Sequence, residues 1–152
     1  MEELITLSIS LGLMVSLVFS EMLGIAAGGM VVPGYVALYL NNPLAVLTTI
    51  ILAYATYFIT TTLGTVMIIY GRRRTVIMIL VGFLLGWLTR SVEVFRFGPE
   101  SLELNVIGYI ITGLIAIWMD RQGVIETIAA LITSSVIVRL ILILIMGKDI
   151  AV

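Results

Sequence analysis

The sequence predicts an all-α integral membrane protein built from about six apolar helical segments. Its composition is 61% hydrophobic and 11% charged, with a mean hydropathy of +1.24, whereas soluble domains are about 45–50% apolar and about 25% charged. The apolar runs are hydrophobic on every side, while a transmembrane β-strand alternates polar and apolar positions, so we expect helices. Residues 29–40 also resemble residues 108–119 at a constant offset of 79 residues, which predicts an internal duplication.

Each expected segment is bounded by charged residues or turn signals. The first has no charge until Glu21, and the second contains Pro33 and Gly34 before an Asn-Asn-Pro turn. The third ends at three consecutive arginines, and the fourth is followed by a polar stretch, residues 89–104, that we expect to be a loop. A turn signal at residues 120–123 separates the fifth from the sixth. The expected segments are residues 4–20, 25–40, 44–70, 75–88, 105–119 and 124–146.

The duplication predicts a single polytopic membrane domain made of two three-segment repeats. The offset places Gly34 on Gly113, so segments two and five are both expected to be broken helices. Repeated apolar segments interrupted by Gly or Pro are typical of a site built at mid-membrane. Thr112 stands opposite Pro33, so the second broken helix should be straighter. The predicted domain covers residues 1–152, with repeats at approximately 4–74 and 75–147.

Two membrane topologies remain open at this point. If all six segments cross the bilayer, the repeats are inverted, and Arg72, Arg73, Arg74 and Arg121 share the cytoplasmic side. If segments two and five are re-entrant, the repeats are parallel and Arg121 lies outside. We prefer six crossings because they place Arg121 with the other arginines. The shortness of segments four and five argues against that choice, since a full crossing needs about 20 residues.

Composition and motifs exclude most hydrolase triads and most zinc sites. The chain has no histidine and no cysteine, which removes the commonest general base, the commonest metal ligand and the thiolate nucleophile. It also has no phosphate-binding loop, nucleotide fingerprint or metal-ligand spacing. We therefore assign no catalytic, cofactor-binding or metal-binding residue, and expect a protein that is not an enzyme by itself. Its 8 basic residues are thinly spread apart from one cluster, so nucleic-acid binding is not expected.

A few charged and helix-breaking residues could carry function. Glu21 either marks a helix end at the membrane interface or faces the broken helix, and the repeat aligns it with Glu100. Pro33 and Gly34 either kink segment two or create a half-helix end facing a polar cavity. Arg139 lies within an apolar segment and needs either a partner elsewhere or a position at the membrane interface. The candidates for a functional path are Glu21, Pro33, Gly34, Gly113, Arg121 and Arg139, and those for partner docking are Arg72, Arg73 and Arg74.

Three elements resemble the PgsC/CapC family, the membrane proteins of poly-γ-glutamate synthesis. In order along the chain, the matching residues are Glu21, Gly24, Ile25, Val31, Val32, Pro33, Gly34 and Tyr35; Tyr70, Gly71, Arg72 and Arg73; and Gly113, Leu114, Ile115, Ala116, Arg121, Gln122 and Gly123. These elements extend over most of the chain in the family's order. One departure is Thr112, where the family's second signature usually has proline.

The resemblance implies a multi-pass subunit in the plasma membrane that takes part in poly-γ-glutamate synthesis or export, for a capsule or a secreted polymer. Its partners would be a cytoplasmic ATP-dependent amide ligase (PgsB/CapB-like), which carries the nucleotide site, and a membrane-anchored extracellular protein (PgsA/CapA-like). This chain would anchor the ligase and assist synthesis or translocation, without a cofactor of its own.

A polyanion crossing hydrocarbon requires positive charge or helix N-termini along its path. Arg121, Arg139 and the broken-helix ends at Pro33, Gly34 and Gly113 could supply them. The arginines at 72–74 could either dock the ligase or draw the polymer to the cytoplasmic mouth. A chain of this size has few helices from which to form a pore. We therefore expect a homo-oligomer or a path shared with partners. Two alternatives are a small inverted-repeat secondary transporter of an anionic metabolite and a passive membrane scaffold for the ligase.

Overall fold

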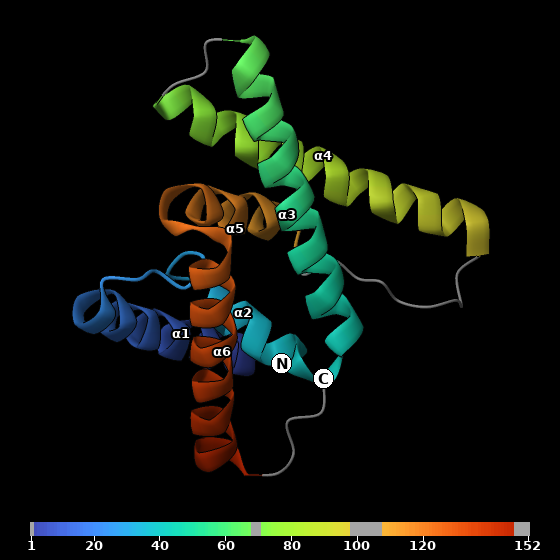
Figure 1. Ribbon diagram of the computed structural model, residues 1–152. Coiled ribbons are helices and arrows are strands. Elements are labelled where there is room, and N and C mark those ends of the chain that lie inside the picture. Colours follow the sequence, from blue (N-terminus) through green and yellow to red (C-terminus); the bar gives the residue numbers. More distant parts are fainter. Residues whose placement is uncertain (1, 68–70, 98–107, 148–152) are drawn as a thin grey trace.

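The structure, a computed structural model, describes residues 2–67, 71–97 and 108–147, and this part of the chain is entirely helical (Figure 1). This confirms the predicted all-α class. In chain order the elements are α1 (Glu2–Leu23), α2 (Val32–Leu38), the 3₁₀ turn η1 (Tyr39–Asn41), α3 (Pro43–Val66), α4 (Arg72–Phe97), α5 (Tyr109–Gln122) and α6 (Val124–Met146).

Three of the described helices are long and apolar enough to cross a membrane. They are Ile5–Leu23 in α1, Pro43–Val66 in α3 and Val124–Ile145 in α6. Helices α2 and α5 have 7 and 14 residues, which corresponds to about 10 and about 20 Å of helix, less than the roughly 30 Å of a hydrocarbon core. Six complete crossings are therefore not confirmed, and segments two and five are the short ones.

Helix α4 is longer than the sequence pattern predicted. It runs for 26 residues from Arg72 to Phe97, so the expectation of a loop was wrong for residues 89–97. The physical reason is that this polar stretch contains no glycine or proline before Gly98 and Pro99, and charged residues alone do not end a helix. Helix α3 ends at Val66, earlier than expected, and Tyr70 lies outside the described residues.

Segment two is broken in a different way from the one predicted. Non-helical backbone precedes α2, and Pro33 lies in the first turn of α2, where its missing N–H would have had no helical partner. Pro33 therefore begins a helix and does not kink one. Segment five was also expected to be broken at Gly113, and this was wrong, because α5 is a continuous helix from Tyr109 to Gln122. A straighter helix at this position agrees with Thr112, which keeps the backbone N–H that proline lacks. A single residue, Gly123, then links α5 to α6 with a φ of +106°, a conformation that glycine adopts readily.

The helices of the two halves of the chain interlock. Helix α3 packs against α4 and α5, and α6 packs against α1 and α2, while α3 and α6 run in opposite directions (Figure 1). The main core gathers apolar side chains from α2, α3, α5 and α6. Large apolar side chains cover the outer faces of the helices, as expected for a surface in contact with lipid tails.

Two backbone contacts between glycines hold the short helices against the long ones. A side-chain carbon at Gly12 of α1 would lie 2.6 Å from the Cα of Gly34 in α2, and one at Gly82 of α4 would lie 2.8 Å from the Cα of Gly113 in α5. Such distances leave no space for a methyl group. Ser8 and Ser16 on the Gly12 face are also buried, so this small-residue stripe of α1 packs within the chain.

Candidate functional site

Arginines from two helix ends meet in one cavity. Arg72 and Arg74 lie in the first turn of α4, and Arg121 lies in the last turn of α5. Together with Asp120 they line a cavity of about 360 Å³, whose other lining residues are Gly71, Thr75, Met78 and Ile117. We call this cavity the arginine pocket. Two of the predicted docking arginines therefore lie beside Arg121. Arg73 is exposed and does not line the pocket.

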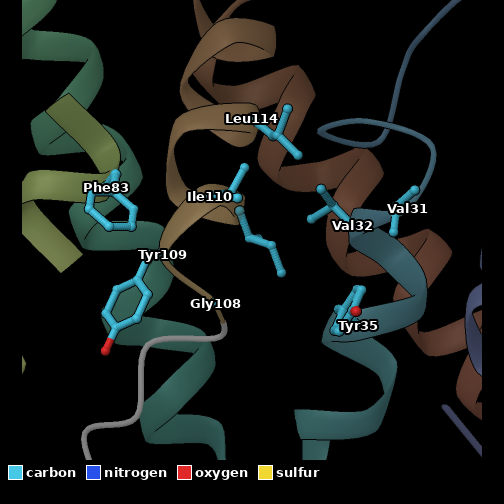
Figure 2. Close-up of a pocket in the computed structure, with 9 residues that line it drawn as sticks. Val31, Val32, Tyr35, Phe83, Gly108, Tyr109, Ile110 and Leu114 are labelled. Carbon is cyan, nitrogen blue, oxygen red and sulfur yellow. The ribbon is translucent and has the colours of Figure 1, made fainter. Parts of the chain in front are cut away.

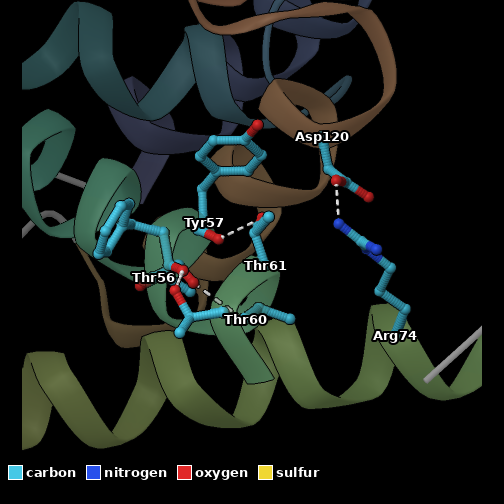
Figure 3. A network of polar contacts seen from close by, with 8 residues as sticks. Thr56, Tyr57, Thr60, Thr61, Arg74 and Asp120 are labelled. Atoms are coloured by element: carbon cyan, nitrogen blue, oxygen red, sulfur yellow. Dashed lines mark hydrogen bonds and ion pairs between the residues drawn. The ribbon is translucent and has the colours of Figure 1, made fainter. Parts of the chain in front are cut away.

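An ion pair fixes the arginine pocket. The Nη2 of Arg74 lies 2.5 Å from the Oδ1 of Asp120 (Figure 3), so it joins the beginning of α4 to the end of α5. The guanidinium of Arg121 lies 5.5 Å from the centre of the Trp118 ring, within the range of a cation–π interaction. The sequence pattern missed Asp120 as a partner because it appeared within a turn signal.

Threonine hydroxyls of α3 lie near this ion pair (Figure 3). Thr56, Thr60 and Thr61 each donate a hydrogen bond to a carbonyl one turn earlier in α3, at 2.7 to 2.8 Å. Because the helix itself satisfies these hydroxyls, the side chains can be buried between helices without a further polar partner. They therefore serve packing, and we assign them no role in the pocket.

Arg139 has the partner that the sequence required but could not name. Its Nη1 donates to the carbonyl oxygens of Ala37 at 3.0 Å and Leu38 at 3.4 Å, and its Nη2 donates to the Oδ1 of Asn41 at 2.6 Å. A cation at this position satisfies the free carbonyls at the end of α2 and opposes the negative end of the helix dipole. Arg139 thus fastens α2 to α6 across the two halves.

Gln122 holds the irregular segment before α2. Its Oε1 accepts a hydrogen bond from the backbone N–H of Ala26 at 3.0 Å, and its Nε2 donates to the Ala26 carbonyl at 2.6 Å. The same Nε2 donates to the Oγ1 of Thr127 at 3.1 Å. Gln122 was noticed in the sequence as part of an Arg-Gln-Gly element, but its pairing with a backbone 96 residues away had no local signal.

The remaining predicted site residues are placed differently from the expectation. Glu21 lies in the last turn of α1, is exposed, and does not end the helix; Glu100 lies outside the described residues. Pro33 and Gly34 are buried. The nearby cavity, of about 410 Å³, is lined by apolar and aromatic side chains from α2, α4 and α5 (Figure 2). The expected polar cavity beside the broken helix is therefore not found in the described structure.

The fold is that of a small helical membrane protein, in which long apolar helices flank two short ones. Residues 11–128 match the profile of the family described as "Capsule biosynthesis CapC". The chain belongs to this CapC family, which confirms the resemblance seen in its motifs.

Two relatives are similar over most of their length. The chain is 38% identical to "Capsule biosynthesis protein CapC" of Bacillus anthracis over 131 residues, which cover 85% of this chain and 87% of the relative. It is 36% identical to "PGA biosynthesis protein CapC" of Bacillus subtilis (strain 168) over 119 residues, covering 77% and 78%. No solved structure matches the chain.

Proposed function

We propose that this chain is the membrane subunit of a poly-γ-glutamate synthesis and export complex in the plasma membrane. The observation that carries the proposal is its membership of the CapC family, whose relatives are named for capsule and PGA biosynthesis. In this proposal the chain anchors a cytoplasmic ATP-dependent amide ligase, works with a membrane-anchored extracellular partner, and assists synthesis or translocation of the polymer.

The arginine-rich end of the molecule is the proposed contact with the ligase. Arg72 and Arg73 are exposed at the beginning of α4, and Arg121 is exposed at the end of α5. Clustered arginines are typical of the cytoplasmic side of a membrane protein, which is where an ATP-dependent ligase works. An acidic surface on that ligase would find complementary charge here, and such charges affect the association rate strongly.

We expect the double variant Arg72→Gln, Arg73→Gln to retain about tenfold less ligase than the unaltered chain at physiological salt, because it removes two rim charges. Co-purification of tagged chain with ligase from detergent-solubilised membranes measures this. The variant with lysine at both positions keeps the charge and should retain most of the ligase. Equal ligase recovery from the glutamine and lysine variants would contradict docking at this end.

We further propose that the two halves are inverted structural repeats. The Gly12–Gly34 contact has a counterpart in Gly82–Gly113, and the third helix of each half packs against the first two helices of the other. The opposite directions of α3 and α6 (Figure 1) support a two-fold axis in the membrane plane.

The alternative of a stand-alone anion transporter has less support. Such a transporter needs a polar site where its broken helices meet, and the cavity there is apolar (Figure 2). Arg139, the cation within an apolar segment that such a site would use, is engaged with the end of α2. We propose that the polymer follows a path formed by a homo-oligomer or shared with the partner subunits.

A further inference from the structure

We propose that the arginine pocket binds the polymer itself, by taking the α-carboxylates of a γ-linked glutamate chain. The identity of this ligand rests on the proposed function. The pocket is distinct from the region around Pro33 and combines three features that favour a carboxylate: a surplus of positive charge, exposed guanidinium groups, and a concave shape.

The charge of the pocket is unbalanced. Arg72, Arg74 and Arg121 line it, and Asp120 is the single acidic residue among its lining residues. The beginning of α4 lies at the same place, and its free backbone N–H groups add partial positive charge. The pocket therefore keeps positive charge after the Arg74–Asp120 pair is formed.

Arg74 already shows how a carboxylate is held here. It binds Asp120 through Nη2 alone, although a guanidinium can present two parallel N–H groups to a carboxylate. Its Nε is buried and has no hydrogen-bond partner among the described residues, and an unmatched buried donor is costly. Arg72 and Arg121 also line the pocket and are exposed, so a carboxylate entering it can pair with their guanidinium groups in the same way.

The shape of the pocket suits a segment of chain better than a bare ion. Its volume of about 360 Å³ falls within the range of small-molecule sites. Met78 and Ile117, both nearly fully buried, lie among its lining residues. Between carboxylates, a γ-linked glutamate chain carries two methylene groups per residue, which can pack against such a floor.

Binding of a fluorescent γ-linked glutamate decamer to the purified chain tests the proposal. The chain is placed in phosphatidylcholine nanodiscs, and anisotropy gives the Kd. We expect Arg72→Gln and Arg121→Gln each to raise the Kd about tenfold, the effect of losing one charged hydrogen bond. Arg73→Gln makes the same charge change just outside the pocket and should raise it less than about twofold. Arg74 is left unaltered because it also joins two helices.

Tryptophan fluorescence is a second measurement, and it locates the bound decamer. The chain has 2 tryptophans, so Trp87→Phe leaves Trp118, in contact with Arg121, as the reporter. Its emission should change with decamer at the concentration that changes anisotropy. Equal losses in the three glutamine variants would overturn the proposal, because binding would then follow net charge. A lipid headgroup site is the other possible outcome. If phosphatidylglycerol nanodiscs change Trp118 emission while the decamer does not bind, the proposal is also overturned.

Ligase co-purification with the same variants, from detergent-solubilised membranes, separates this inference from the proposed function. Ligase retained by a chain that does not bind the decamer would overturn only the pocket. Decamer binding that depends on Arg72 and Arg121, without ligase retention, would support the pocket and contradict docking.

Discussion

Replacing Gly34 by valine is expected to abolish accumulation of folded protein. A side-chain carbon at Gly34 would lie 2.7 Å from the carbonyl oxygen of Ser8 and 2.9 Å from the Cα of Ile9. Both are backbone atoms of α1 and cannot rotate away, so α1 and α2 would have to separate. That would also break the hydrogen bond of 2.7 Å from the Ser8 hydroxyl to the Gly34 carbonyl. Overpacking of this kind costs about 1–3 kcal/mol or more, a large part of a membrane protein's stability.

The measurement is the yield of monodisperse protein after detergent extraction, followed by thermal unfolding. Gly64→Ala is the matched control, since the nearest atom to its added carbon is Nη1 of Arg74 at 3.8 Å. Alanine also favours the helix over glycine by about 1 kcal/mol, so Gly64→Ala should unfold at the same temperature or higher. If the halves are repeats, Gly113→Val should lower the yield of folded protein as strongly as Gly34→Val does. Normal yields of Gly34→Val would contradict the backbone contact.

Arg139→Ala is expected to destabilise the protein by about 2 kcal/mol, because it removes the charged donor from the partly buried carbonyl oxygens of Ala37 and Leu38 at the end of α2. The hydrogen bond to the exposed Oδ1 of Asn41 is lost as well. Arg139→Lys should recover only part of the loss, since an ammonium cannot reproduce the fork that reaches a carbonyl and the Asn41 side chain together. Denaturant unfolding in detergent measures both variants, and polymer output should fall with stability.

Arg73→Ala is the matched control for Arg139→Ala, because it removes an exposed guanidinium from the same chain. Its unfolding midpoint should match that of the unaltered protein. An Arg139→Ala variant that is fully stable but makes no polymer would contradict the capping role and would return Arg139 to the polymer path.

The sequence predicted those features that depend on local composition. Helical class followed from hydropathy, and the expected sixth segment, residues 124–146, coincides with α6. The end of α4 was missed because charged residues between 89 and 97 resemble a loop by composition but contain no helix breaker. Pro33 was recognised as a break, but a proline signal does not distinguish a kink from a helix start.

Contacts between distant parts of the chain had no such local signal. The Arg139–Ala37 contact joins residues 102 apart in the sequence, and the Arg74–Asp120 pair joins residues 46 apart. The apolar surroundings of Arg139 indicated that it needed a partner, but not which one. The preferred topology placed Arg72, Arg74 and Arg121 on one side, but it did not predict that they line one cavity with Asp120.

In the proposed function, polymer synthesis at the membrane requires this chain together with the ATP-dependent ligase. Inside-out vesicles containing the ligase and the extracellular partner, with or without the chain, are supplied with ATP and radiolabelled glutamate, and labelled polymer is measured. We predict polymer only when the chain is present, with less in the Gly34→Val and Arg139→Ala vesicles. Equal amounts of polymer with the chain omitted would contradict the account.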